Sequence, residues 1–369
     1  MNLDTRTSLL LVLAAAASWS GSALPAAAQV PDLPGWQLVW QDEFDGDGVD
    51  TDNWEVLTRQ NSFNNEKQYY VPEQATVVDG KLRITATNQP LANKAYRSAR
   101  LESWQAFGPG RFEARIDLPT TQGMWPAFWL FPNSPSIPWP TGGEIDIMEN
   151  RGSQPTIVSS AYHWPGPGQC GASNCRFQSY ATLDGEGSVV NFHNGFHVYA
   201  VEWDETQLRF YVDGHLHFVL NESGNLPIFE TPKNIILNLA VGGIYDGDPD
   251  GTTVFPQVME VDYVRVWQRQ VPLPGDYNGD GQVDAGDYVR WRNHLGEANE
   301  ANINNNGDGG GVEMSDYGHW KAHYGNPGSG SGGLTLAVPE PTTWLLVAFA
   351  ALVRLCTRRR THELEYNRS

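Results

Sequence analysis

Three carboxylates lie close together in residues 142–150, whose sequence is GGEIDIMEN. Side chains alternate between the two faces of a β-strand, so Glu144 and Asp146 share one face while Ile145 and Ile147 share the other. The isoleucine face predicts a hydrophobic core. Like charges on one face of a strand repel one another and destabilise it, so a chemical role explains them better than a solvated strand surface does.

Glu149 does not fit a regular strand, because strict alternation would place it with the isoleucines, where an ionised carboxylate is unfavourable. A bulge of one residue at Ile147 or Met148 returns Glu149 to the face of Glu144. The two glutamates then stand four steps apart, about 13 Å at 3.3 Å per step. Side chains of roughly 4 Å reach that lean together leave the carboxyl groups about 5 Å apart, the separation found in retaining glycosidases. The spacing predicts that one glutamate attacks while the other donates and later accepts a proton.

The residues around this stretch carry a family resemblance. The motif ExDxxE after Gly-Gly, preceded by GMWPAFWL at residues 123–130, resembles glycoside hydrolase family 16. The additional residue Met148 resembles the laminarinase, agarase and carrageenase branch, and the likeness runs over residues 40–267. It implies a jelly roll that cleaves β-1,3-glucan internally. The alternatives are a hydrolase of algal galactan, a transglycosylase, or a glucan-binding surface protein without turnover.

The resemblance also assigns roles to the three carboxylates. It implies that Glu144 is the nucleophile, Asp146 its electrostatic partner and Glu149 the acid/base. From the sequence, Asp146 either raises the proton affinity of Glu149 or holds Glu144 by a hydrogen bond.

Two tryptophans near the motif are predicted to contact the substrate. Trp125 and Trp129 are four residues apart, so on a strand they share the cleft face, while Phe128 and Leu130 point to the core. Either tryptophan could instead belong to the core. Trp104 is a weaker candidate of the same kind.

Three polar residues complete the predicted substrate site. Asn65 lies in residues 64–70, which resemble the laminarinase loop before the cleft, and Arg100 lies in residues 98–103, which resemble the strand facing the catalytic one. Arg100 would either keep a carboxylate ionised or form a peripheral salt bridge. His163 would bond a sugar hydroxyl or be a structural histidine.

Composition supports an all-β sandwich. The 369 residues carry a net charge of −19, so a polyanion would be repelled and we expect no nucleic-acid partner. Between residues 36 and 267, short alternating stretches are separated by Gly, Pro, Asn and Asp, while helical periodicity is nearly absent. The predicted strands are 37–40, 75–78, 82–86, 110–117, 125–131, 145–149, 197–203, 207–212, 234–240 and 257–267.

The ends of the chain predict export. Residues 1–28 read as a signal peptide, with an apolar run and the small residues of a cleavage site, and residues 29–270 as the catalytic domain. Cys170 and Cys175 bracket four residues in a Gly/Pro-rich loop, which predicts a disulfide in an exported protein; a metal site would need more ligands of the same softness.

Residues 275–325 are predicted to bind calcium through a helical module. Oxygen ligands at the spacing of an EF-hand-type loop wrap Ca²⁺. The predicted ligands are Asp276, Asn278, Asp280, Gln282 through its carbonyl, and Asp287. A second, longer loop with fewer acidic ligands begins at Asn304, and its calcium occupancy stays open. Paired loops of this kind resemble a type I dockerin, which implies a cohesin-like protein partner.

The resemblance to family 16 implies a further, structural calcium ion on the convex face of the sandwich. Asp262 and Glu43 match its ligand positions.

The C-terminal region resembles a sorting tag. A Gly/Ser linker is predicted at residues 326–337. Residues 338–369 hold Pro-Glu-Pro, an apolar run and arginines, and they resemble a PEP-CTERM tail. We therefore expect a secreted or envelope-associated protein whose membrane contact is limited to this tail; a lasting C-terminal anchor is the alternative.

Overall fold

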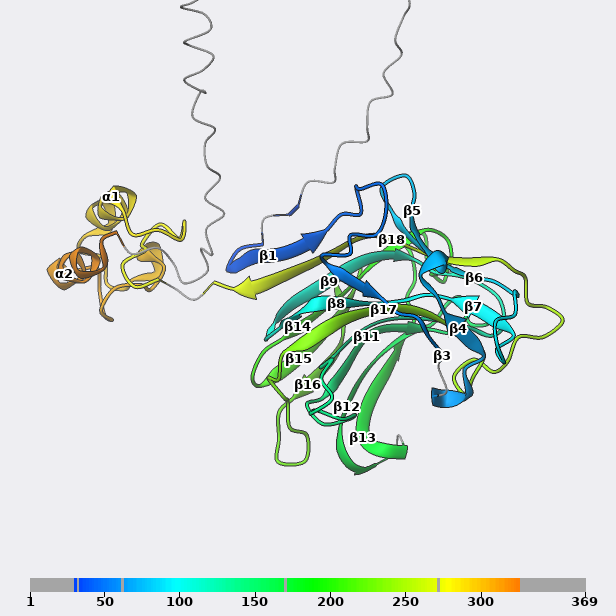
Figure 1. Ribbon diagram of the computed structural model, residues 1–369. Coiled ribbons are helices and arrows are strands. Elements are labelled where there is room, and N and C mark those ends of the chain that lie inside the picture. The colour runs from blue at the N-terminus through cyan, green and yellow to red at the C-terminus, as the bar shows by residue number, and fades with distance from the viewer. Residues whose placement is uncertain (1–29, 32, 61–62, 169–170, 271–272, 326–369) are drawn as a thin grey trace, which may run out of the picture. The chain divides into compact units, whose positions relative to one another are not determined.

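A computed structural model describes residues 30–31, 33–60, 63–168, 171–270 and 273–325. The predicted signal peptide, the linker and the C-terminal tail lie outside these residues. Two large antiparallel sheets account for most of residues 36–269, so the prediction of a β-rich sandwich is confirmed (Figure 1).

The first large sheet runs, in spatial order, β16 (His215–Asn221), β15 (Gln207–Val212), β14 (Phe196–Trp203), β9 (Gly110–Asp117), β18 (Gln257–Arg269), β6 (Leu82–Ala86) and β5 (Ala75–Val77), with β1 (Trp36–Asp42) also paired to β18. The second runs β13 (Gly171–Tyr180), β12 (Val158–Gly168), β11 (Glu144–Asn150), β10 (Met124–Phe131), β17 (Lys233–Val241), β8 (Arg100–Phe107) and β2 (Trp54–Val56). A small sheet contains β3 (Arg59–Gln60), β4 (Gln68–Tyr70) and β7 (Tyr96–Ser98), and the short 3-10 helices are η1 (Phe63–Asn65) and η2 (Pro72–Gln74).

The hydrophobic core lies between the two large sheets. Its fully buried side chains include Phe112, Ala114 and Ile116 of β9, Phe128 and Leu130 of β10, Leu237 and Leu239 of β17, and Val264 and Val266 of β18. Within each strand these residues alternate with others that face away, and removing the apolar faces from water drives the sheets together. The opposite face of the second sheet is therefore left to carry the carboxylates.

All the predicted strands form, but several others escaped prediction, including β12, β13 and β16. The order of the second sheet also corrects one expectation. The strand of Arg100, β8, does not face the catalytic strand β11; it belongs to the same sheet, with β10 and β17 between them.

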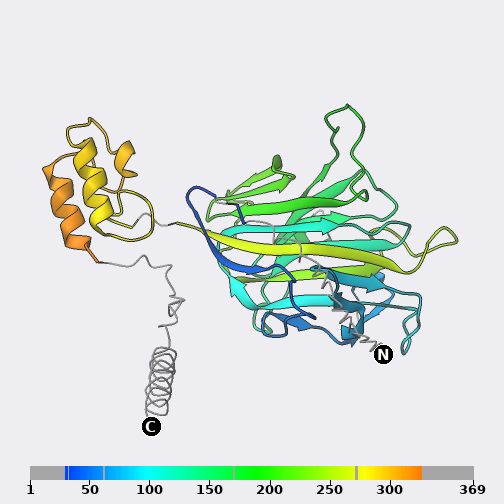
Figure 2. The same cartoon turned by 90° about the horizontal axis from the view of Figure 1, so that it is seen from above.

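Residues 273–325 form a helical module with α1 (Ala285–His294), η3 (Ala301–Ile303) and α2 (Met314–His323), and α1 and α2 lie side by side (Figure 2). Its two halves exchange equivalent bonds: Trp291 Nε1 donates to the carbonyl of Glu313 at 2.8 Å, and Trp320 Nε1 donates to the carbonyl of Asp284 at 2.9 Å. α1 begins three residues before the predicted helix at Tyr288, because Asp284 caps its N-terminus. In the described part of the chain, no helix is long and apolar enough to cross a membrane.

Candidate active site

The bulge predicted in the catalytic strand is present. Against β10, Phe128 pairs with Met148 and Trp129 pairs with Asp146, so Ile147 is the additional residue. The register against β12 shifts over the same interval. Ile147 and Met148 are both buried, which gives the strand two successive core-facing residues.

The bulge brings the three carboxylates to one face of the sheet. Across β12, Glu144 pairs with His163, Asp146 with Ala161 and Glu149 with Ser159. Glu144 and Glu149 are half-buried and Asp146 is buried. The parity argument from the sequence therefore holds for each of the three.

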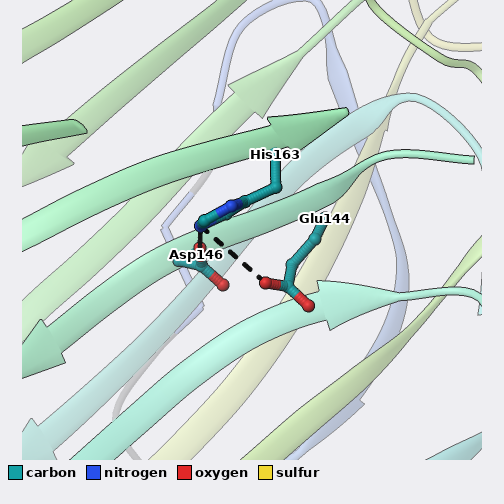
Figure 3. A group of neighbouring side chains, drawn as sticks. All are labelled: Glu144, Asp146 and His163. Atoms are coloured by element: carbon teal, nitrogen blue, oxygen red, sulfur yellow. Dashed lines mark ion pairs between the residues drawn. The ribbon is translucent and has the colours of Figure 1, made fainter. Parts of the chain in front are cut away.

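His163 lies against the first two carboxylates. Its Nε2 is 3.3 Å from Asp146 Oδ2 and 4.0 Å from Glu144 Oε1. Figure 3 marks both contacts with dashed lines. One ring nitrogen of His163 and one carboxylate oxygen each of Glu144 and Asp146 lie within 4.8 Å of one another. This contact with the carboxylates is neither of the two roles expected for His163, a bond to a sugar hydroxyl or a structural histidine, and both of those stay predictions.

The environment of this group favours protons on its carboxyls. Burial raises the pKa of Glu144 well above its usual value, and the charge of Asp146 raises it further, while His163 opposes the shift. Burial also raises the pKa of Asp146. Close carboxylates in a low dielectric cannot all ionise together, so this pair retains a proton at pH values where free carboxyls have lost theirs.

Glu149 has a different kind of neighbour. Trp125 Nε1 donates a hydrogen bond of 2.8 Å to Glu149 Oε1. Burial, followed by the charge of Asp146, raises the pKa of Glu149 to about 8, while the Trp125 bond and the charges of His163 and Arg151 act in the opposite direction. A carboxyl group with this pKa is protonated at neutral pH and can act as a general acid.

The two tryptophans of β10 lie as predicted with respect to the sheet. Both Trp125 and Trp129 are half-buried, while Phe128 and Leu130 are fully buried on the opposite face. Trp129 Nε1 donates to Asn238 Oδ1 at 2.7 Å. The two indoles therefore have polar anchors that fix their ring planes on the carboxylate face.

Arg100 forms its ion pair with Glu102 on its own strand, and not with one of the three carboxylates of β11. Its guanidinium lies 2.6 Å from Glu102 Oε1, with both side chains largely buried, and its Cζ is 4.7 Å from the ring centroid of Trp129. Its charge still contributes to lowering the pKa of Glu144, as the smallest of several effects. Its main contacts therefore position Trp129 and neutralise Glu102.

The remaining predicted substrate residues, Trp104 and Asn65, lie outside strands β10, β11 and β12 in different surroundings. Trp104 on β8 is 56% exposed, and its Nε1 donates to the carbonyl of Thr51 at 2.9 Å. Asn65 has a positive φ of 61° and helps to line a pocket of about 530 Å³ together with Lys67 and Asp248. An exposed, anchored indole can stack on a sugar ring, so Trp104 remains a candidate.

Two exposed aromatic residues that lie near the three carboxylates were not predicted from the sequence. Phe177 of β13 pairs with Ala161 of β12, which pairs in turn with Asp146, so Phe177 lies on the carboxylate face. Its side chain is 64% exposed. Trp139 is 43% exposed, with its ring centroid 6.1 Å from that of His163. Phe177 could have been found by alternation, had residues 171–180 been recognised as a strand.

The first predicted calcium loop has the right donors and turn. Asp276 accepts bonds from the amides of Gly279 and Gly281, at 2.7 and 2.9 Å. Gly281 has a φ of +82°, a conformation that glycine adopts without strain, and Asp287 is buried. Carboxylate and carbonyl oxygens are the ligands that Ca²⁺ prefers, so the residues present fit the ion.

The second loop gathers carboxylates more closely than expected. Among the described residues, Glu300, Asp308 and Asp316 bring ligand oxygens within 4.8 Å of one another. Glu300 precedes the predicted loop and accepts bonds from the amides of Gly307 and Gly309. Sequence spacing alone gave no reason to include it.

The predicted structural ion of the sandwich does not fit the side chains. Glu43 binds Arg265 with both oxygens, at 2.7 and 2.8 Å, and Asp262 lies 2.7 Å from Arg115. Each carboxylate is already neutralised by a different guanidinium. In this structure Glu43 and Asp262 form ion pairs, so their side chains lend no support to the predicted ion, and their assignment as its ligands stays a prediction.

Cys175 is buried and disulfide-bonded. Its predicted partner, Cys170, lies outside the described residues, so the pairing stays a prediction.

A β-sandwich with two glutamates and an aspartate on one bulged strand defines a glycoside hydrolase. The family model for glycosyl hydrolases family 16 matches residues 58–265, and the chain belongs to this family.

Two known proteins and one solved structure are similar to this chain over about two thirds of its length. The chain is 36% identical over 293 residues to the "Beta-glucanase" of Rhodothermus marinus, covering 71% of this chain and 94% of that protein. It is 35% identical over 246 residues to the "Clotting factor G alpha subunit" of Tachypleus tridentatus, covering 64% of this chain and only 34% of that protein. The solved catalytic domain of an endo-1,3-β-glucanase (laminarinase) from Thermotoga petrophila RKU-1 is 37% identical with a TM-score of 0.59, covering 64% of this chain and 99% of that structure.

Proposed function

We propose that this protein cleaves β-1,3-glucan of the laminarin type within the polymer, with retention of anomeric configuration. The observation that carries the proposal is the bulged strand β11, which turns Glu144 and Glu149 to one face, where burial raises the pKa of Glu149 to about 8. One carboxyl group is thereby held ready to donate a proton near neutral pH while another stands on the same face to attack.

The reaction follows from these positions. Glu144 attacks the anomeric carbon while Glu149 donates its proton to the leaving oxygen, which forms a glycosyl-enzyme ester and frees one end of the polymer. Glu149, now ionised, removes a proton from water, and the resulting hydroxide oxygen attacks the anomeric carbon and releases Glu144. Two displacements on the same carbon restore the original configuration.

Asp146 and His163 have a supporting role in this scheme. The Glu144 and Asp146 pair shares a proton, and the attack requires that this proton reside on Asp146. His163, 3.3 Å from Asp146 and 4.0 Å from Glu144, favours the ionised form of both carboxyls when it carries a charge. Together the two residues allow Glu144 to attack as a carboxylate despite its burial.

Substrate binding is assigned to the aromatic side chains of the carboxylate face. The faces of Trp129 and Phe177 can stack on sugar rings, and exposed Trp104 and Trp139 can extend the contact to further residues of a long polymer. β-1,3-Glucan is favoured over galactan because the stretches around Asn65 and Trp125 resemble laminarinases.

The test is reducing-sugar release by the full chain on laminarin, mixed-linkage glucan, agarose and carrageenan, with Glu144→Ser as the control. We expect rapid mid-chain cleavage of laminarin that the variant lacks. Cleavage of a galactan alone would keep the mechanism and overturn the substrate. Binding without any release would identify a glucan-binding protein, and products longer than the substrate would identify a transglycosylase.

We also propose that the protein is exported and that its helical module attaches it to a cohesin-like partner. The equivalent bonds of Trp291 and Trp320 in the two halves support a paired-loop module. Calcium would be held by the carboxylates of the first loop, where its charge would relieve the repulsion between Asp276 and Asp280. Calorimetric titration with Ca²⁺ tests this: Asp276→Ala should abolish binding at the first loop, whereas Asp79→Ala, in a turn of the sandwich, should not.

A further inference from the structure

Tyr245 lies in the segment between β17 and β18, nearly a hundred residues from the catalytic strand in sequence, yet it packs on the tryptophan that binds Glu149. The rings of Tyr245 and Trp125 are stacked, with centroids 4.7 Å apart and planes inclined by 21°. An indole ring with no neighbour on its face can rotate, and rotation would move Nε1 away from Glu149. A ring stacked on that face restricts the rotation. The N–H bond to Glu149 is 2.8 Å long.

Contacts with two residues, Ser159 and Arg151, hold Tyr245 itself. Its hydroxyl lies 2.5 Å from Ser159 Oγ, and Ser159 is the residue that pairs with Glu149 across β12. Arg151, two residues after Glu149, donates from Nε to the carbonyl of Tyr245 at 2.7 Å, and its Cζ is 4.0 Å from the tyrosine ring centroid. Tyr245 is thus held both by Ser159, which pairs with Glu149 on the neighbouring strand, and by Arg151, which follows Glu149 in the chain.

The loop that carries Tyr245 is anchored independently of the ring. The next residue, Asp246, is buried and accepts a bond of 2.8 Å from the amide of Gly123, just before β10, and bonds from the amide and hydroxyl of Ser153. The segment therefore joins the ends of β10 and β11 at the point where the acid/base lies. An anchored loop can hold a side chain with the precision that a proton donor requires.

We propose that Tyr245 is a positioning residue that holds the indole of Trp125 with its N–H directed at Glu149. Arg151 and Ser159 hold Tyr245 in turn. This inference rests on the proposed role of Glu149 as acid/base. It adds that a residue of a distant loop fixes the hydrogen bond that Glu149 accepts.

The electrostatics agree with the geometry. The charged and titratable groups around Glu149 are Glu144 and Asp146 on its own strand, His163 on β12, Arg151 after β11, and Tyr245. The indole N–H stabilises the ionised form and so opposes the upward pKa shift caused by burial. If the N–H turns away, the pKa of Glu149 rises further, and the acid becomes a weaker proton donor.

The experiment compares Tyr245→Leu, Tyr245→Phe and Trp125→Phe in the full chain, with Ile244→Ala as a matched control, because Ile244 is the neighbouring residue and is 70% exposed. We expect Tyr245→Leu to lower kcat on laminarin about 10-fold to 100-fold with little change in KM, part of the 10²–10⁴-fold that a positioned acid contributes. The alkaline limb of the kcat/KM profile should move up by about 1 to 2 pH units, the size of one bond to a charged group. Tyr245→Phe keeps the ring and should show a smaller change of the same sign.

Two readouts separate positioning from a structural effect. On a dinitrophenyl glycoside, whose leaving group needs no proton, formation of the glycosyl enzyme should be nearly normal in Tyr245→Leu. In a Trp125→Phe background, the same substitution should have almost no additional effect, because the N–H it positions is absent.

The opposite results overturn the inference. A raised KM with an unchanged pH profile would make Tyr245 a substrate contact, and additive effects of the two substitutions would show that it does not act through Trp125. If Tyr245→Leu fails to fold, judged by circular dichroism, Tyr245→Phe and Trp125→Phe complete the same cycle. An inactive wild-type chain, or full activity in Glu149→Gln, would instead refute the proposed function.

Discussion

The two ends of strand β11 carry the same kind of residue in contrasting surroundings. Glu144 lies among groups that can themselves gain or lose a proton, Asp146 and His163. Glu149 receives a hydrogen bond from the indole of Trp125, which cannot accept a proton. Both glutamates have raised pKa values, mainly through burial, so burial does not distinguish them.

What distinguishes the two glutamates is whether the neighbour can exchange a proton. At the first end, Asp146 can take the proton and leave Glu144 ionised, which a nucleophile requires. At the second end, no partner within the hydrogen bond competes for the proton, so in the proposed mechanism Glu149 keeps it until the substrate oxygen accepts it. The proposal thus gives two identical side chains separate roles that follow from their environments.

The largest expected effect comes from deleting each carboxyl. Glu144→Ala and Glu149→Ala should both lose activity on laminarin by about 10⁴-fold, the upper end for a single catalytic carboxyl group. Added azide should reactivate both on an activated aryl glycoside, giving a glycosyl azide of inverted configuration with Glu144→Ala and of retained configuration with Glu149→Ala. Nuclear magnetic resonance of the products measures this directly. The same configuration from both variants would contradict the assigned roles.

The smaller loss predicted for Asp146→Asn tests the exchange of the shared proton. The amide cannot take the proton from Glu144, so kcat should fall by about 10². In the free enzyme Asp146 carries part of the negative charge of the proton-sharing pair, and this charge raises the pKa of Glu149, so removing it should move the alkaline limb of the kcat/KM profile to lower pH. The control is Asp213→Asn, a carboxylate paired with His197 on the first sheet. An unchanged alkaline limb would show that Asp146 does not influence the acid.

The contrast between the two ends also marks how far sequence reasoning could reach. The bulge was predictable, because an ionised Glu149 could not lie with the isoleucines, and this parity argument needs only nearby residues. The indole bond of Trp125 could not be predicted, since it depends on the register of β10 against β11. Tyr245 gave no local signal at all: it lies in a glycine-rich loop without periodicity, and only tertiary packing brings it to the site.

Strands β12 and β13 were missed for a related reason. Pro165 lies within β12, and proline lacks the N–H that a central strand needs. The pairing of β11 with β12 ends at the Glu144–His163 pair, so Pro165 lies beyond β11 and is paired on one side only, with Ser173 of β13. Whether a proline breaks a strand depends on where the adjacent strand ends, and the sequence around the proline does not contain this information.

A modest effect is expected from His163→Gln. The charge of a protonated His163 lowers the pKa of Glu144, so the neutral amide should move the acidic limb of the kcat/KM profile to higher pH by less than about 1 unit. The alkaline limb should also move up, but less, because His163 lies in contact with the Glu144 end. Equal movement of both limbs would show that His163 does not distinguish the two glutamates.

The smallest effect concerns stability. Glu149 has a pKa of about 8 in the folded protein and 4.5 as its ordinary value, so between these pH values the folded state binds more protons than the unfolded one. The free energy of unfolding therefore falls as pH rises through this window. Glu149→Gln removes the titration and keeps an oxygen for the indole N–H, so it should raise Tm at pH 8 and leave it nearly unchanged at pH 4. For a domain of this size, each kcal/mol gained corresponds to about 2–4 °C, which differential scanning calorimetry resolves. A gain in Tm of equal size at pH 4 would mean that Glu149→Gln acts through packing. The cost of an ionised, buried Glu149 would then not explain the gain at pH 8.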